Sequence, residues 1–170
     1  MENFIHRVIG ASKLNVSTYE DVEADKSSFG QAITVVILSS LAASLSLSGL
    51  TEIPKIALLA NFMTAWLLWA WLTFFIGTRI LPEPQTEANW GQLLRTTGFA
   101  ASPGILRFIG ILPGLTIPIY LLTEIWMLVA FVIAVRQALD YTTTGRAVGV
   151  CLLGWFIATT FNVILRGLIS

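Results

Sequence analysis

Histidine, cysteine and charged residues are scarce in this chain, and each scarcity excludes a class of function. His6 is the sole histidine, so a histidine-rich zinc site or a Ser-His-Asp triad inside an apolar segment is not available. Cys151 is the sole cysteine, which excludes an intramolecular disulfide and a cysteine zinc cluster and leaves a packing role. Charged residues make up 12% of the chain, against about 25% in ordinary soluble domains. That fraction leaves too little polar surface to keep a compact domain in water.

Motifs of catalysis are missing as well. The sequence has no glycine-rich loop ending in Gly-Lys-Ser/Thr, so it offers no basis for ATP hydrolysis. It also lacks the deep pair of acidic residues that intramembrane aspartyl proteases use. The formal net charge is zero, which argues against a nucleic-acid partner. We therefore expect a non-enzymatic protein without a cofactor or a bound metal.

Long apolar stretches fill most of the chain, and they identify its solvent as a lipid bilayer. A helix of about 20 mostly apolar residues spans a hydrocarbon core of roughly 30 Å. The sequence therefore predicts an all-α fold, a polytopic membrane bundle of five transmembrane helices. The stretches cover residues Phe29–Leu50, Ile56–Thr78, Thr96–Leu112, Ile117–Val135 and Ala147–Leu165.

The residues before the first stretch differ in character from the rest. Residues 1–28 are mixed and charged, unlike a cleavable signal peptide, and we expect a cytoplasmic N-terminal segment there. Residues 1–13 predict a short amphipathic helix in the membrane interface, with Phe4, Val8 and Ile9 on its apolar face. Residues 29–170 then form the transmembrane domain.

A second short helix is expected within this segment, capped by Ser17 or Thr18. Its acidic residues suit the positive end of the helix dipole. They form either a solvated helix start or a docking surface for a basic partner. These acidic residues are Glu20, Asp21 and Glu23, followed by Asp25.

The distribution of lysine and arginine predicts the orientation, because these residues favour the cytoplasmic side of a membrane. With a cytoplasmic N-terminus, only Lys55, Arg107 and Arg166 fall on or near the outer side. An odd number of spans then leaves Ser170 outside. The residues on or near the cytoplasmic side are Arg7, Lys13, Lys26, Arg79, Arg95, Arg136 and Arg146.

The apolar stretches are not equivalent. The first is rich in small residues, including Ser40 and Ser44, which let helix backbones approach closely. We expect this face to be buried against other helices, and it is also a candidate surface for association with a partner. The second stretch carries a polar side chain, Asn61, with Ala57 and Ala65 one turn away on either side.

Proline and glycine interrupt the third stretch. Pro103 lies inside it and Pro113 follows it, and proline removes a backbone donor and kinks a helix. In a membrane the freed backbone groups must find partners on neighbouring helices. We therefore expect a kinked or broken third helix inside the bundle. Transporters place substrate sites at such breaks.

Arg107 and Glu124 are the two charges predicted to lie within the hydrocarbon. Each costs several kcal/mol when unpaired, by insertion scales, so each needs a partner. Each lies about seven or eight residues from the outer turn between the third and fourth stretches, or roughly 10–12 Å deep. Adjacent antiparallel helices would bring the two side chains level. The pair is interpreted as a folding clamp or, alternatively, as a proton or substrate relay.

Several segments together resemble the prokaryotic branch of the Yip family of Ypt-interacting membrane proteins. The resemblance covers about residues 10–165 and rests on the order and spacing of its motifs. These are Tyr19-Glu20-Asp21-Val22-Glu23-Ala24-Asp25-Lys26 with Gly30-Gln31-Ala32, Thr97-Gly98-Phe99-Ala100-Ala101-Ser102-Pro103, Ile125-Trp126, Val135-Arg136-Gln137-Ala138-Leu139-Asp140 and Thr144-Gly145-Arg146-Ala147.

The resemblance implies a five-helix bundle with a cytoplasmic N-terminus, and a prokaryotic plasma membrane as its location. Eukaryotic relatives act in vesicle trafficking and bind Rab-type GTPases or one another. This chain lacks their long N-terminal region and their Asp-Leu-Tyr-Gly-Pro motif, which speaks against GTPase binding.

The expected function is that of a membrane scaffold or organiser, acting through helix packing and through protein or lipid partners, including copies of itself. One alternative is a small transporter or channel that uses the broken third helix, with Arg107, Glu124 and Asn61 near a cavity. A second alternative is an accessory subunit of a larger membrane complex.

Overall fold

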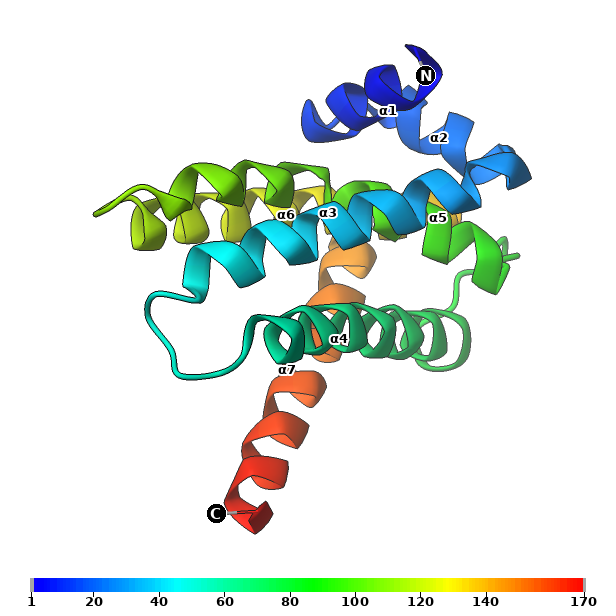
Figure 1. Cartoon of the computed structure of the whole chain (residues 1–170). Coiled ribbons are helices and arrows are strands. Elements are labelled where there is room, and N and C mark those ends of the chain that lie inside the picture. The colour runs from blue at the N-terminus through cyan, green and yellow to red at the C-terminus, as the bar shows by residue number, and fades with distance from the viewer. Residues whose placement is uncertain (1, 170) are drawn as a thin grey trace.

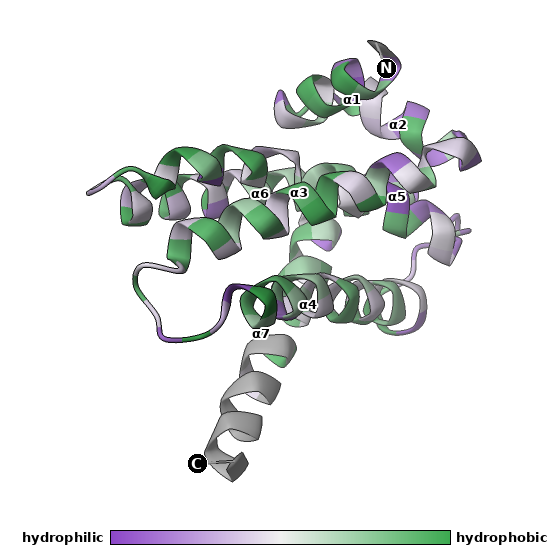
Figure 2. Cartoon of the chain, in the orientation of Figure 1, coloured by the Kyte–Doolittle hydropathy of each residue, from purple (hydrophilic) through white to green (hydrophobic). Residues whose placement is uncertain are grey.

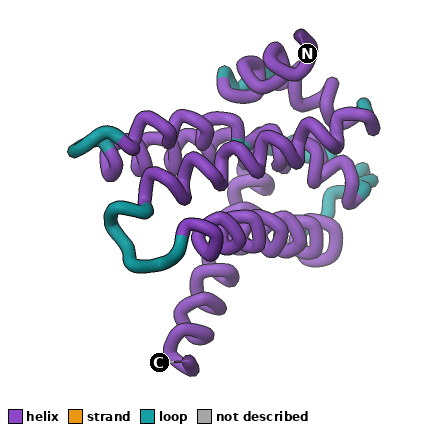
Figure 3. The backbone as a smooth tube through the Cα atoms, viewed as in Figure 1, coloured by secondary structure: helices purple, strands orange, loops and turns teal. Residues whose placement is uncertain are grey.

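The computed structural model describes the backbone of residues 2–169 and the side chains of residues 3–157 and Thr160. Over this range the chain consists of helices joined by loops, without a strand (Figure 3). Seven segments are α-helices, η1 and η3 are 3-10 helices, and η2 is one turn of π-helix. The elements are α1 Glu2–Ser12, α2 Val16–Ala24, η1 Lys26–Ser28, α3 Phe29–Leu47, α4 Lys55–Phe75, η2 Ile76–Ile80, α5 Trp90–Ala100, η3 Ser102–Ile111, α6 Thr116–Ala138 and α7 Thr144–Ile169.

Three helical segments of the described chain are long and apolar enough to cross a membrane: Lys26–Leu47, Lys55–Ile80 and Thr116–Ala138. The described part of α7 includes a shorter apolar stretch, Thr144–Ile157. Apolar residues surround α4 and α6 on most sides (Figure 2). A helix that is apolar all round is typical of a membrane span. The predicted third stretch is divided between α5 and η3, which have 11 and 10 residues.

The helices form two levels in the view of Figure 1. In the upper level α3, η3 and α6 lie side by side, and α1 and α2 lie above them. In the lower level α4 runs along the underside of this layer. Helix α7 begins against α6 and α4 (Figure 1).

Glycines of α5 and η3 allow a close approach to α3. A methyl group on Gly98 would lie 2.8 Å from Cβ of Ala32 and 3.1 Å from its carbonyl oxygen. Further along, Gly104 meets the Ser39 side chain and Gly110 meets the Ser46 side chain. Small residues on both sides thus bring the two backbones together, which is the usual packing device inside membranes.

The small-residue face of α3 is consequently buried within the chain itself. Ser40 and Ser44 are 6% and 1% exposed. The Ser44 hydroxyl donates to the Lys55 carbonyl at 2.7 Å and so joins α3 to the start of α4. Neighbouring helices of the same chain cover these two serines, as expected for a packing face, and the association with a partner stays a prediction.

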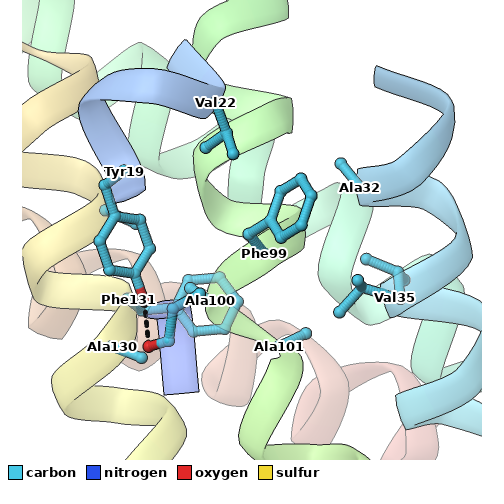
Figure 4. Close-up of a cluster of buried hydrophobic side chains, with 12 residues drawn as sticks. Tyr19, Val22, Ala32, Val35, Phe99, Ala100, Ala101, Ala130 and Phe131 are labelled. Atoms are coloured by element: carbon cyan, nitrogen blue, oxygen red, sulfur yellow. Dashed lines mark hydrogen bonds between the residues drawn. The ribbon is translucent and has the colours of Figure 1, made fainter. Parts of the chain in front are cut away.

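The N-terminal hairpin of α1 and α2 packs on the side of the bundle. Figure 4 shows Val22 of α2 beside Phe99 of α5, with Tyr19 in the same buried apolar cluster, which also includes residues of α3 and α6. The Tyr19 hydroxyl donates to the Ala11 carbonyl at 3.0 Å. The Trp126 indole N–H donates to the Ser12 carbonyl at 2.7 Å, so the end of α1 lies beside the middle of α6.

Two details of this hairpin correct the sequence analysis. The cap of α2 is Asn15, whose Oδ1 accepts the Ser17 N–H at 3.1 Å, and not Ser17 or Thr18. Thr18 is the third residue of α2 and is buried against Gly10, so it lies inside the helix. On α1, Phe4 and Val8 pack against the core, whereas Ile9 is 48% exposed.

Hydrogen bonds join the loops that follow η2 and α6 at one end of the bundle. The Tyr141 hydroxyl donates to the carbonyls of Gly77 and Leu81, at 3.0 and 2.8 Å. A π-helical turn leaves carbonyls without their α-helical donors, and Tyr141 supplies one. Glu83 accepts hydrogen bonds from the backbone and side chain of Thr142 and forms an ion pair with Arg146.

Candidate functional site

Arg107 of η3 and Glu124 of α6 form an ion pair between two neighbouring elements. The Arg107 Nε–H also donates to the Thr123 hydroxyl at 3.0 Å. Its guanidinium carbon lies 4.2 Å from the ring centroid of Tyr120, a cation–π contact. Three residues of α6, Tyr120, Thr123 and Glu124, therefore hold one arginine of η3.

Exposure differs sharply between the two charges. The Arg107 side chain is 5% exposed, whereas that of Glu124 is 53% exposed. The guanidinium is thus enclosed by η3 and α6. The carboxylate faces outward from the same contact.

The local folding of residues 101–116 places this pair. Pro103 stands at the start of η3, where its missing N–H does no harm. Pro113 lies in the exposed connection to α6, together with Gly114, whose φ of +80° suits glycine. The Thr116 hydroxyl donates to the Gly110 carbonyl at 2.7 Å and closes this connection. Glu124 follows Thr116 by eight residues, or about 12 Å along the helix.

A cavity of about 670 Å³ adjoins the ion pair and is lined by residues of α3, α4, η3, α6 and α7. Arg107, Glu124 and Asn61 all line it, and Ser40 contributes at its α3 side. The volume lies within the range of small-molecule sites in proteins, roughly 300–1,000 Å³. Most of the wall is apolar or aromatic and includes Phe62, Trp66, Trp69, Leu121, Phe131 and Trp155.

The cavity thus brings together four of the candidate residues. Ser44, Pro103 and Pro113 do not line it and serve the packing and the chain path instead. Two partners of Arg107 are absent from the sequence-based candidates, namely Tyr120 and Thr123. A sequence signal for Tyr120 exists, because it precedes Glu124 by four residues and therefore shares its helix face.

Outside the spans, Arg7 anchors the N-terminal hairpin. Its guanidinium donates to Asp21 and Asp25, each at 2.8 Å, and to the Gln31 side chain at 3.1 Å. Hydrogen bonds from the Ser27 hydroxyl, and next from Arg7, lower the pKa of Asp25 to about 2. Part of the predicted acidic cluster is therefore engaged within the chain and is not free for a basic partner.

Glu23 stands in a different environment. Burial, followed by the nearby charge of Asp140, raises the pKa of Glu23 to about 7. Gln92 donates to its carboxylate at 3.2 Å, while Arg95 donates to its backbone carbonyl and to that of Val22. In the loop between η2 and α5, a hydrogen bond from the Thr142 backbone N–H lowers the pKa of Glu83.

Among the residues that the structure describes, no three His, Cys, Asp or Glu side chains are grouped so that they could hold a metal ion. Cys151 is a free, buried thiol in α7. The arrangement around Arg107 is therefore an electrically neutral pair beside an apolar cavity, with a carboxylate as its accessible polar group.

Comparison with known proteins places the chain in a family. The family model of the Yip1 domain matches residues 15–165, which is most of the chain and includes α2 to α6 and most of α7. No curated protein and no solved structure matches it. Together with the apolar helices, this match establishes that the chain is a membrane protein of the Yip1 domain family.

Proposed function

We propose that this protein is a non-enzymatic membrane scaffold, which holds protein or lipid partners and catalyses no reaction. The observation that carries the proposal is the use of Arg107, which joins η3 to α6 through Glu124, Thr123 and Tyr120. A charge within the bundle is thereby committed to holding helices together. Buried charges in membrane proteins must be paired in this way unless they serve a pathway.

The finer topology belongs to the same proposal. Five segments cross the membrane, the third made of α5 and η3, with the N-terminus in the cytoplasm of a prokaryotic cell. The contacts between residues 81–86 and 140–146 support it, because they join the loops that must share the cytoplasmic side. Ser170, which this topology leaves outside, lies beyond the described residues.

Cross-linking in native membranes tests the scaffold. In a Cys151→Ala background, single cysteines replace Leu152 or Leu122, which are 50% and 57% exposed on α7 and α6. A scaffold gives a cross-linked species of defined mass from one of these faces, either a second copy or an identified protein. A buried position, Ala134→Cys, is the control and gives none. Monomer alone from every face would contradict a scaffold that holds protein partners.

A small transporter is the second candidate, and the cavity favours it because Asn61, Arg107 and Glu124 line one space. An intramembrane carboxylate beside a cavity is also the arrangement of proton relays. Proteoliposomes loaded with a pH-sensitive dye and given a pH gradient test this candidate. Faster dissipation by wild type than by Glu124→Gln supports transport. Equal rates for both proteins and for empty vesicles exclude proton movement through Glu124.

A further inference from the structure

The cavity between α4 and the α3–η3–α6 layer has apolar walls and one polar corner. Aromatic and aliphatic side chains from three helices make most of the wall, including Phe62, Trp66, Leu121, Phe131 and Trp155. Burial of apolar ligand surface against such walls supplies most of the affinity in small-molecule sites, and a few polar groups fix the orientation. The polar corner is formed by Arg107 and Glu124.

Glu124 is the charge that a ligand meets. Its Oε2 accepts from Arg107, while its Oε1 accepts no hydrogen bond from the described residues. Its side chain is 53% exposed, and most of the cavity wall is apolar. A carboxylate oxygen in apolar surroundings is costly unless a donor reaches it. A ligand group that donates a hydrogen bond to Oε1 of Glu124 would therefore be favoured here.

The charge balance determines which donor fits. Arg107 and Glu124 sum to zero, and Arg107 stands directly behind the carboxylate. A cationic head group would leave a net positive charge in a medium of low dielectric, where charges are poorly screened. An anionic head group would face the exposed carboxylate. A neutral head group avoids both costs.

We propose that this cavity binds a neutral amphiphile with a hydroxyl head group. The O–H donates to Oε1 of Glu124, and the apolar chain lies against the aromatic wall. Asn61, on the facing helix α4, offers an amide to the same head group. The inference goes beyond the scaffold proposal and requires no transport, because a bound amphiphile can be a structural component of the bundle.

Tryptophan quenching in nanodiscs tests the proposal, because Trp66, Trp69 and Trp155 line the cavity. Four probes carry the same brominated alkyl chain and differ only in the head group: alcohol, methyl ester, carboxylate or primary ammonium. Bromine quenches a tryptophan that it contacts. We expect saturable quenching by the alcohol at about one tenth of the ester concentration, since a hydrogen bond to a charged group is lost in the ester.

Two variants test whether Glu124 and the cavity determine the binding of the probes. Glu124→Gln leaves Arg107 without its counter-charge, so the alcohol loses its advantage and the carboxylate probe becomes the preferred ligand. Ala65→Phe fills the cavity from α4 without touching the ion pair, and it abolishes saturable quenching by all four probes. This second variant decides the matter if Glu124→Gln fails to fold. Glu87→Gln, in an exposed loop, is the control and binds as wild type does.

Three results would overturn the proposal. Equal quenching by all four probes in wild type would mean that the cavity takes an apolar chain without reading its head group. Preference of wild type for the ammonium or the carboxylate would contradict the argument from charge balance. Unchanged alcohol binding in Ala65→Phe would place the ligand elsewhere. Failure of the scaffold proposal has a different readout, the absence of cross-linked species.

Discussion

Arg107 is enclosed and Glu124 is half-exposed, although the two side chains form one ion pair. The pair therefore faces two surroundings at once. On the arginine side, η3 and α6 close around the guanidinium with a hydroxyl and an aromatic ring. On the glutamate side the apolar cavity begins. One contact thus stabilises the helices and also sets the polarity of the space beside them.

Removal of either charge should destabilise the bundle, because the other charge then lies in apolar surroundings without a partner. We expect Arg107→Leu and Glu124→Leu each to lower the free energy of unfolding in mixed detergent micelles. The double variant should lose less than the sum of the two, with a coupling energy of about 0.5–3 kcal/mol. Glu87→Leu is the matched control. A coupling energy of zero would show that the pair is not a clamp.

The close approach of α5 to α3 predicts a sharp contrast between two glycines. In Gly98→Ala the new methyl group meets Ala32, including its backbone, so the helices must separate. We expect a loss of about 1–3 kcal/mol in the free energy of unfolding. Gly30→Ala, on α3, has no neighbour within 4 Å and should be neutral or slightly stabilising. Similar losses in both variants would contradict the packing described for this interface.

Arg7 predicts how firmly the N-terminal hairpin is held. Arg7→Leu removes hydrogen bonds to Asp21, Asp25 and Gln31. We expect faster hydrogen exchange in α1 and a loss of about 1–3 kcal/mol, the usual range for hydrogen bonds to charged groups. Lys13→Leu, at an exposed position, should leave exchange in α1 unchanged. Unchanged exchange in Arg7→Leu would mean that the apolar contacts alone hold the hairpin.

Asp25 makes the same attachment resistant to acid. Because its pKa in the folded protein, about 2, lies below the usual value of about 3.9, its contribution to stability is complete above pH 4. It is lost as the pH falls from about 4 through 2. The loss of α1 protection that Asp25→Asn causes should therefore be the same at pH 5 and pH 7, after correction for the intrinsic exchange rate.

Glu23 predicts the opposite dependence on pH. Its raised pKa of about 7 means that the folded protein binds its proton more tightly than the unfolded chain does, with a usual value of about 4.3. Stability should therefore fall as the pH rises from about 4.5 to 7. Thermal unfolding at pH 5 and pH 8 should show a difference that is smaller in Glu23→Gln. The same difference in both proteins would assign the effect to other groups.

The proposed orientation predicts which loops a membrane-impermeant maleimide reaches. In a Cys151→Ala background, Glu52→Cys lies in the exposed loop between α3 and α4, and Glu87→Cys lies in the loop before α5. We expect labelling of position 52 in intact cells and labelling of position 87 only after permeabilisation. The reverse pattern would invert the topology, and labelling of both in intact cells would contradict the crossing of α4.

The sequence predicted the helical class, the family and the importance of Arg107 and Glu124. These predictions were possible because the length of an apolar stretch and a charge within it can be recognised from a single segment. That Arg107 and Glu124 lie level with each other was predicted by counting residues to one turn, and the ion pair confirms it. The partners of Arg7 could not be predicted, because they depend on how α1 and α2 pack against each other. The 3-10 form of η3 could not be predicted either, since no local pattern in the sequence marks it.

The glycine–serine contacts between η3 and α3 are spaced differently along the two helices. On η3 the glycines at 104 and 110 are six residues apart, which is two turns of a 3-10 helix. On α3 their partners Ser39 and Ser46 are seven residues apart, which is about two turns of an α-helix. Contacts that are six residues apart on η3 therefore match contacts that are seven residues apart on α3. Insertion of one residue between Gly104 and Gly110 would move one of these glycines away from its serine, whereas the same insertion in the loop after η3 would leave both contacts in place.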